Sequence, residues 1–121
     1  MFNHITLKVS DFKKSLAFYR AVLAPLGYEE QSLDEAGKSV GFGPKGTPQL
    51  WLAEGKPHSI VHVAFDARSR DAVKRFYGQA LEAGGKDNGP PGVRADYAAD
   101  YYAAFVMDPD GNNIEAVTFK G

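Results

Sequence analysis

Cysteine is absent from the 121-residue chain, and this absence excludes several kinds of chemistry. Without thiols the protein can form no disulfide framework, no thiolate zinc site and no cysteine nucleophile. Long apolar runs are also missing, and the N-terminal sequence MFNHITLKVSD lacks the apolar segment of a signal peptide. The sequence therefore predicts a cytoplasmic protein that has no membrane partner.

A large excess of either charge is missing as well. The formal net charge is -1, so the composition offers no general electrostatic reason to bind nucleic acid. The chain is long enough for one domain with a substantial core, but too short for a two-domain enzyme with a separate cofactor module. One compact unit is therefore expected.

The chain contains an internal repeat, in which His62 lies 58 positions after His4. At the same offset, without a gap, other residues match. The matched pairs are Ile5 with Val63, Phe18 with Phe76, Tyr19 with Tyr77, Leu23 with Leu81, and Gly27 with Gly85. Such self-similarity indicates two copies of one structural unit.

Each unit has the same expected order of elements. Alternating apolar residues predict an opening strand at 4–9 and at 61–66, and an amphipathic helix follows each strand. Turn residues then separate three short strands, which we place at 28–34, 38–43 and 49–53 in the first unit and at 86–88, 101–107 and 113–119 in the second. The prediction is an α+β fold in which two βαβββ modules form a curved mixed sheet with both helices on its outer face. Module one spans 1–54, a linker spans 55–57, and module two spans 58–121.

Two of the three histidines, His4 and His62, occupy equivalent positions just inside the opening strands. In a pseudo-symmetric pair of sheets we expect these positions to meet near the pseudo-twofold axis. Glu115 lies on the closing strand of the second unit, where a carboxylate costs free energy unless a partner neutralises it. His4, His62 and Glu115 are therefore predicted to converge as a metal site. Two imidazoles and one carboxylate suit Fe(II), Mn(II), Ni(II), Co(II) or Zn(II), with open positions for water or substrate.

A plainer interpretation of these three residues stays open. His4 and His62 would be hydrogen-bonded core residues, and Glu115 would face solvent at a sheet edge. The two interpretations differ in one observable, which is whether the Glu115 carboxylate points toward the imidazoles.

The turns that precede the two closing strands suggest a position for a fourth metal ligand. Pro44-Lys45-Gly46 matches Pro109-Asp110-Gly111 at an offset of 65, which places Leu50 opposite Glu115. A shift of one residue places Gln49 there instead. Leu50 cannot bind a metal, and Gln49 can do so only through its amide oxygen.

The paired βαβββ plan, the segment HITLKVSDFKKSLAFYRAVLAPLGYE and the segment DPDGNNIEAV resemble the vicinal oxygen chelate superfamily. This superfamily includes glyoxalase I, extradiol dioxygenases, fosfomycin resistance enzymes and bleomycin resistance proteins, and the resemblance spans nearly the whole chain. Its metal ligands come from the first and last strands of each unit, which implies His4, His62 and Glu115 here, with Gln49 or Leu50 at the fourth place. The resemblance also implies a divalent metal cofactor and a homodimer, formed either by exchange of units or by docking of intact chains.

At two places the sequence differs from the pattern of its relatives, and these differences limit the activities that the resemblance implies. Extradiol dioxygenases carry a tyrosine three residues before the aspartate of the D-P-x-G turn, where this chain has Phe105, and no histidine follows His62. Ring cleavage is therefore not expected. The segment NGPPGVRADYAADYYAAFVMDPDGNNIEAV is most similar to a small uncharacterised glyoxalase-like group, but Asp96 and Ala98 stand where its members often have histidine.

The segment that follows Pro90 is also the expected substrate wall. Arg94 can pair with an anionic group, and aromatic surface can come from Trp51, Tyr97, Tyr102 and the adjacent Tyr101. The leading hypothesis is a metal-dependent, glyoxalase-like lyase or isomerase in which Glu115 is also the catalytic residue. The alternative is a non-catalytic small-molecule binder of the bleomycin resistance kind. A third hypothesis is a fold that serves only as an interaction module.

Overall fold

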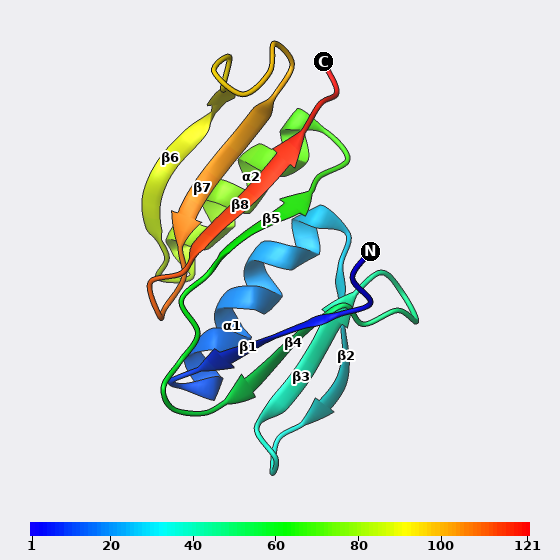
Figure 1. Cartoon of the computed structure of the whole chain (residues 1–121), viewed down its shortest axis with the longest axis vertical. Coiled ribbons are helices and arrows are strands. Elements are labelled where there is room, and N and C mark those ends of the chain that lie inside the picture. Colours follow the sequence, from blue (N-terminus) through cyan, green and yellow to red (C-terminus); the bar gives the residue numbers. More distant parts are fainter.

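The computed structural model describes all residues from 1 to 121, and its elements repeat as the sequence predicts (Figure 1). The first module contains β1 (Ile5–Val9), α1 (Phe12–Leu23), the short 3-10 helix η1 (Ala24–Leu26), β2 (Glu29–Asp34), β3 (Ser39–Gly43) and β4 (Leu50–Glu54). The second contains β5 (His62–Asp66), α2 (Arg70–Glu82), β6 (Lys86–Val93), β7 (Tyr102–Met107) and β8 (Asn113–Thr118). Neither α1 nor α2 has the length and hydrophobicity that a membrane-spanning helix needs.

The strands form two four-stranded mixed sheets of the same design. Their orders are β1-β4-β3-β2 and β5-β8-β7-β6, with the first pair of each sheet parallel and the others antiparallel. The predicted α+β fold of two βαβββ modules is therefore confirmed. No hydrogen-bonded ladder joins β1 to β5, so each of these strands is an edge, and the two edges face each other beside α1 (Figure 1).

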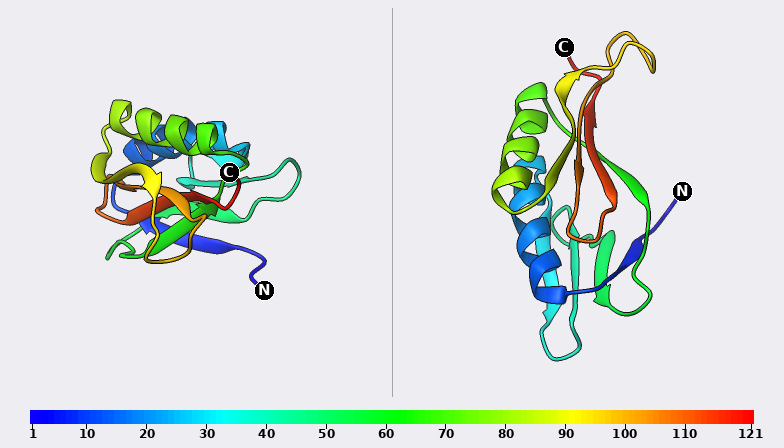
Figure 2. Two further views of the ribbon diagram at one scale, coloured as in Figure 1. Left: turned by 90° about the horizontal axis from the view of Figure 1, so that it is seen from above. Right: turned by 90° about the vertical axis from the view of Figure 1, so that its left-hand side faces the viewer.

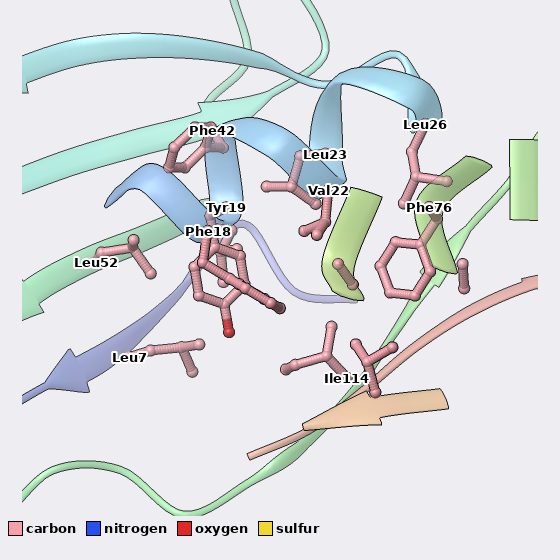
Figure 3. Close-up of a cluster of buried hydrophobic side chains, with 14 of the residues drawn as sticks. Leu7, Phe18, Tyr19, Val22, Leu23, Leu26, Phe42, Leu52, Phe76 and Ile114 are labelled. Atoms are coloured by element: carbon pink, nitrogen blue, oxygen red, sulfur yellow. The ribbon is translucent and has the colours of Figure 1, made fainter. Parts of the chain in front are cut away.

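Both helices cover the same side of the molecule, and the strands make up the other side (Figure 2). Between the two layers lies one core of 23 buried residues drawn from both modules. In Figure 3 the side chains of Phe18 and Tyr19 from α1 and of Phe76 from α2 gather with Leu7 and Ile114 from the strands. The two modules therefore share one apolar interior, which neither could enclose alone.

The start of β8 is fixed by the turn that contains Asp108, Asp110 and Asn112. Asp108 is only 5 % exposed, and its carboxylate accepts hydrogen bonds from the backbone N–H groups of Asp110 and Asn112. The hydroxyl of Tyr19 in α1 donates to the same carboxylate over 2.6 Å. Asn112 in turn accepts the N–H of Val61 through Oδ1 at 2.8 Å. The turn therefore holds the beginning of β5 beside the beginning of β8.

One strand is longer than the sequence predicts. We expected a strand at 86–88, but β6 continues to Val93 through Gly89-Pro90-Pro91-Gly92. The prolines are tolerated because β6 is an edge strand with a single partner, and its pairing with β7 shifts register twice along this stretch.

Candidate functional site

The second sheet brings His62 and Glu115 into direct contact. Ala64 in β5 pairs with Glu115 in β8, and His62 lies two residues before Ala64, so both side chains project from the same face of the sheet. His62 Nε2 lies 2.8 Å from Glu115 Oε1. Because a carboxylate only accepts hydrogen bonds, Nε2–H of His62 is the donor. The plainer interpretation is therefore wrong for Glu115, whose carboxylate points toward an imidazole rather than into solvent.

Tyr101 provides the second partner of the same carboxylate. Its hydroxyl donates a hydrogen bond to Glu115 Oε2, so both carboxylate oxygens are occupied. Burial, reinforced by this hydrogen bond, raises the pKa of Tyr101 to about 12. The phenol therefore stays protonated, and remains a donor, throughout the neutral pH range.

Glu115 is 1 % exposed and lies in largely apolar surroundings. Phe105 in β7 pairs directly with it, and Ala103, Phe105 and Val117 form a small cluster on this face, separate from the main core. The ring centre of Phe105 lies 6.2 Å from that of His62. A carboxylate in such a place depends on its two hydrogen-bond partners, because burying a charge without partners costs several kcal/mol, on the order of 5.

Arg94 and Tyr97, two of the predicted substrate contacts, lie beside the aromatic neighbours of this pair. The guanidinium of Arg94 stacks over Phe105 at 5.4 Å, and its Nη2 donates to the carbonyl of Pro90 over 2.6 Å. Tyr97 is 65 % exposed, and its ring centre is 5.0 Å from that of Tyr101. Side chains that can contact a ligand thus border the buried carboxylate.

Tyr102, the fourth predicted substrate contact, lies on the opposite face of the sheet. It is buried in the main core, where the guanidinium of Arg70 sits over its ring at 4.7 Å. Successive residues of a strand point to opposite faces, so Tyr101 and Tyr102 cannot share a surface. The prediction that Tyr102 contacts substrate is therefore wrong, and it is Tyr101 that lies beside Glu115.

His4 does not join His62 and Glu115 within the chain. It is exposed just before β1, and its Nδ1 lies 2.7 Å from Asn3 Oδ1. No three His, Asp or Glu side chains of the chain gather closely enough to hold an ion. His4, Gln49 and His62 do line one cavity of about 620 Å³, which lies between β1 and β5 and is otherwise mainly apolar.

Strand pairing corrects the predicted counterpart of Glu115 in the first module. Ile5 pairs with Leu50 as Val63 pairs with Ile114, so Trp51 is equivalent to Glu115. Both sequence-based alternatives, Leu50 and Gln49, are wrong, because the turn before β4 differs in length from the turn before β8. Leu50 instead belongs to the main core. The first module therefore carries the indole of Trp51, and no carboxylate, at the position equivalent to Glu115.

The chain is similar in sequence to known proteins. The model of the Glyoxalase/Bleomycin resistance protein/Dioxygenase superfamily matches residues 1–116. The metallothiol transferase FosB of Shouchella clausii is 31% identical over 127 aligned residues, which cover 96% of this chain and 78% of that protein.

Solved structures agree with this match. A glyoxalase/bleomycin resistance protein from Albidiferax ferrireducens superimposes with a TM-score of 0.79 at 26% identity, over 97% of each chain. A variant of the fosfomycin resistance protein FosX from Listeria monocytogenes, complexed with Mn(II) and 1S,2S-dihydroxypropylphosphonic acid, gives a TM-score of 0.69 at 21% identity. That comparison covers 97% of this chain and 88% of the other, and it shows a likeness of fold alone.

Proposed function

Because this chain belongs to the Glyoxalase/Bleomycin resistance protein/Dioxygenase superfamily, we propose that it is a metal-dependent enzyme of the glyoxalase type. The proposed reaction class is that of a lyase or isomerase acting on a small oxygen-bearing substrate. The observation that carries the proposal is the contact at 2.8 Å between Nε2 of the exposed His62 and Oε1 of the buried Glu115. A histidine nitrogen and a carboxylate oxygen that face each other at this distance are a donor pair suited to a divalent ion.

Three side chains would hold the ion in this proposal, namely His62 through Nε2, Glu115 through Oε1, and His4. When bound, Fe(II), Mn(II), Ni(II), Co(II) or Zn(II) supplies a Lewis acid that polarises a substrate oxygen and stabilises developing negative charge. For Nε2 to bind an ion it must carry no proton, so His62 would have to adopt the tautomer with its proton on Nδ1, which ends the hydrogen bond to Glu115. The Glu115 carboxylate is itself shielded from bulk water, which strengthens its interactions.

We further propose that a second copy of the chain supplies His4. β1 and β5 are both edge strands, and edge strands readily receive a strand from another chain. Met1 and Phe2 precede His4, and Ile60 precedes His62; all three are large apolar residues that are exposed in the single chain. In a twofold homodimer, β1 of each copy would lie beside β5 of the other. The exposed apolar side chains of both copies would then be covered.

The substrate contacts proposed for this site are Arg94, Tyr97 and Trp51. Arg94 and Tyr97 lie in the loop between β6 and β7, close to Phe105 and Tyr101 respectively. Trp51 occupies the position in the first sheet that is equivalent to Glu115 in the second. In this proposal its side chain would contact the substrate from the first module. Arg94 would receive an anionic or polar end of the substrate, and the aromatic rings would contact its apolar part.

The proposed function is tested by the metal content of the protein, purified without a metal-chelating resin. We expect a divalent ion in the wild type and a large loss in Glu115→Gln, which removes the only anionic ligand and preserves its shape. His58→Ala is the matched control, because His58 lies in the connecting segment and its Nδ1 contacts the carbonyl of Ser59 rather than the site. Assays of the metal-loaded protein should include thiol transfer, the activity named for the Shouchella clausii relative.

The alternative function is a metal-free small-molecule binder of the bleomycin resistance kind. One observation favours it, namely that Trp51 rather than a carboxylate stands at the position equivalent to Glu115. Trp51 is the sole tryptophan, so the test is direct: an aromatic ligand bound against it would quench its fluorescence. Quenching by aromatic ligands in a protein that holds no ion would support the binder and reject the enzyme.

A further inference from the structure

We propose that Tyr101 is a positioning residue that holds Glu115 so that only Oε1 is offered to the ion. The inference rests on the proposed metal site and adds a residue that the three-ligand set does not contain. Tyr101 would touch neither the ion nor the substrate, and would act only through its hydrogen bond to Glu115 Oε2.

Of the two hydrogen bonds that Glu115 accepts, one must break when an ion binds and the other can remain. The bond from His62 joins Nε2 to Oε1, and these are the two atoms that an ion would need, so this bond must break. The bond from Tyr101 uses the other oxygen and can persist. Tyr101 is therefore the one partner that restrains the buried carboxylate both before and after the ion binds.

The position of the Tyr101 hydroxyl is itself well determined. Its ring packs edge-on against Tyr97 on one side, at 5.0 Å, and against Phe119 on the other, at 5.2 Å. Its backbone carbonyl accepts the N–H of Arg94 over 2.7 Å, which closes the loop that leads into β7. A donor fixed in this way costs little additional ordering when the ligand set assembles.

The restraint matters because the two oxygens of an unrestrained carboxylate are equivalent. Glu115 would otherwise be able to rotate, exchange its oxygens, or offer both at once. Hydrogen bonds to metal-bound side chains commonly change metal affinity by about 10- to 100-fold, and the Tyr101 bond is of this kind. The same bond also offsets the cost of burying the charge in the metal-free protein.

The test compares Tyr101→Phe with the wild type by titrating Mn(II) into metal-free protein and following the paramagnetic resonance of the free ion. We expect the Mn(II) dissociation constant to rise about 10- to 100-fold. We also expect the spectrum of the bound ion to change, because Oε2 is released. The matched control is Tyr77→Phe, which removes a hydroxyl that donates to Asp87 on another part of the surface, and it should change neither quantity.

The outcomes separate this inference from the proposed function. Equal affinity and an unchanged bound-ion spectrum in Tyr101→Phe would overturn the role of Tyr101 and leave the metal site standing. A wild type that binds no ion would overturn both. If Tyr101→Phe fails to fold, the wild type still gives a test, because the Tyr101 hydroxyl proton should stay protected in NMR spectra after Zn(II) is added. Loss of that signal on addition of Zn(II) would contradict the inference.

Discussion

At the scale of single residues, the chain buries two carboxylates and gives each a tyrosine partner. Glu115 accepts from Tyr101 on the open face of the second sheet, and Asp108 accepts from Tyr19 on the core side. The two pairs differ in what else surrounds the carboxylate. Asp108 is saturated by backbone N–H groups and by Asn112, so it is structural. Glu115 has only His62 besides its tyrosine, which leaves it able to change partners.

The structural pair leads to a prediction for Tyr19→Phe. The variant leaves a buried oxygen of Asp108 without one of its donors, and we expect a loss of about 2 kcal/mol in the free energy of unfolding. Urea unfolding at pH 7.5 would measure it. The control is Tyr97→Phe, which removes an exposed hydroxyl that makes no hydrogen bond in the structure and should change stability by less than about 0.5 kcal/mol.

The same tyrosine makes stability depend on alkaline pH. Burial, followed by the neighbouring Asp108, raises the pKa of Tyr19 well above its usual value. A group whose pKa is raised in the folded state stabilises fully below its unfolded pKa, about 10, and loses that contribution as the pH rises further. Wild-type stability should therefore fall more steeply between about pH 10 and 11 than that of Tyr19→Phe. Parallel slopes would show that Tyr19 is not buried against Asp108.

At the scale of secondary-structure elements, the turn before β8 sets the geometry of the site. Asn112 bridges two strands, because its Oδ1 accepts from Val61 N–H while its Nδ2 donates to Asp108. The backbone N–H of Asn113 donates to the carbonyl of Val61 over 3.0 Å at the same place. These bonds set the stagger of β5 against β8, and that stagger brings His62 within reach of Glu115.

Asn112→Ala should therefore affect both stability and the site. Loss of the side chain leaves the N–H of Val61 without a partner and leaves Asp108 Oδ2 with Tyr19 as its one donor, and we expect a loss of about 2 kcal/mol in unfolding free energy. Metal affinity should weaken as well, since the start of β5 is freed. Asn3→Ala, at an exposed position before β1, is the matched control for stability. A variant as stable as the wild type would show that the turn does not bear on the pairing of β5 with β8.

Sequence patterns predicted the elements better than the relation between them. Alternating apolar residues located β1 and β5 within one residue, because a half-buried strand must alternate. The counterpart of Glu115 was misplaced, because register depends on turn length, and Trp51 lies one position beyond Leu50. Alternation applied to Tyr101 and Tyr102 would have shown that only one of them can face Glu115.

At the scale of the whole molecule, the single chain assembles two of the three predicted ligands. His62 and Glu115 meet, but His4 stands before an edge strand of the other sheet. Figure 1 shows β1 and β5 running in opposite directions, and the two strands belong to different sheets. Equivalence in the repeat predicted which residues correspond, but it could not predict that a single chain would leave the histidines apart.

A shared site predicts complementation between two inactive variants. His4→Ala and Glu115→Gln should each bind Mn(II) weakly as separate dimers, because every site lacks one ligand. After the subunits exchange, a mixed dimer would combine His4 of one copy with His62 and Glu115 of the other. Random pairing would restore about one quarter of the sites, measurable by Mn(II) titration. A mixture that binds no better than its components would place all three ligands in one chain or reject the site.

The central claim, that His62 and Glu115 are ligands of a divalent ion, is tested most directly by a crystal structure of the protein grown with Mn(II). We predict an anomalous difference peak about 2.0–2.3 Å from both His62 Nε2 and Glu115 Oε1, with an imidazole of His4 completing the set. The contact between those two atoms, now 2.8 Å, should open as the ion enters between them. A fully Mn(II)-saturated crystal with the hydrogen bond intact and no peak beside Glu115 would contradict the claim.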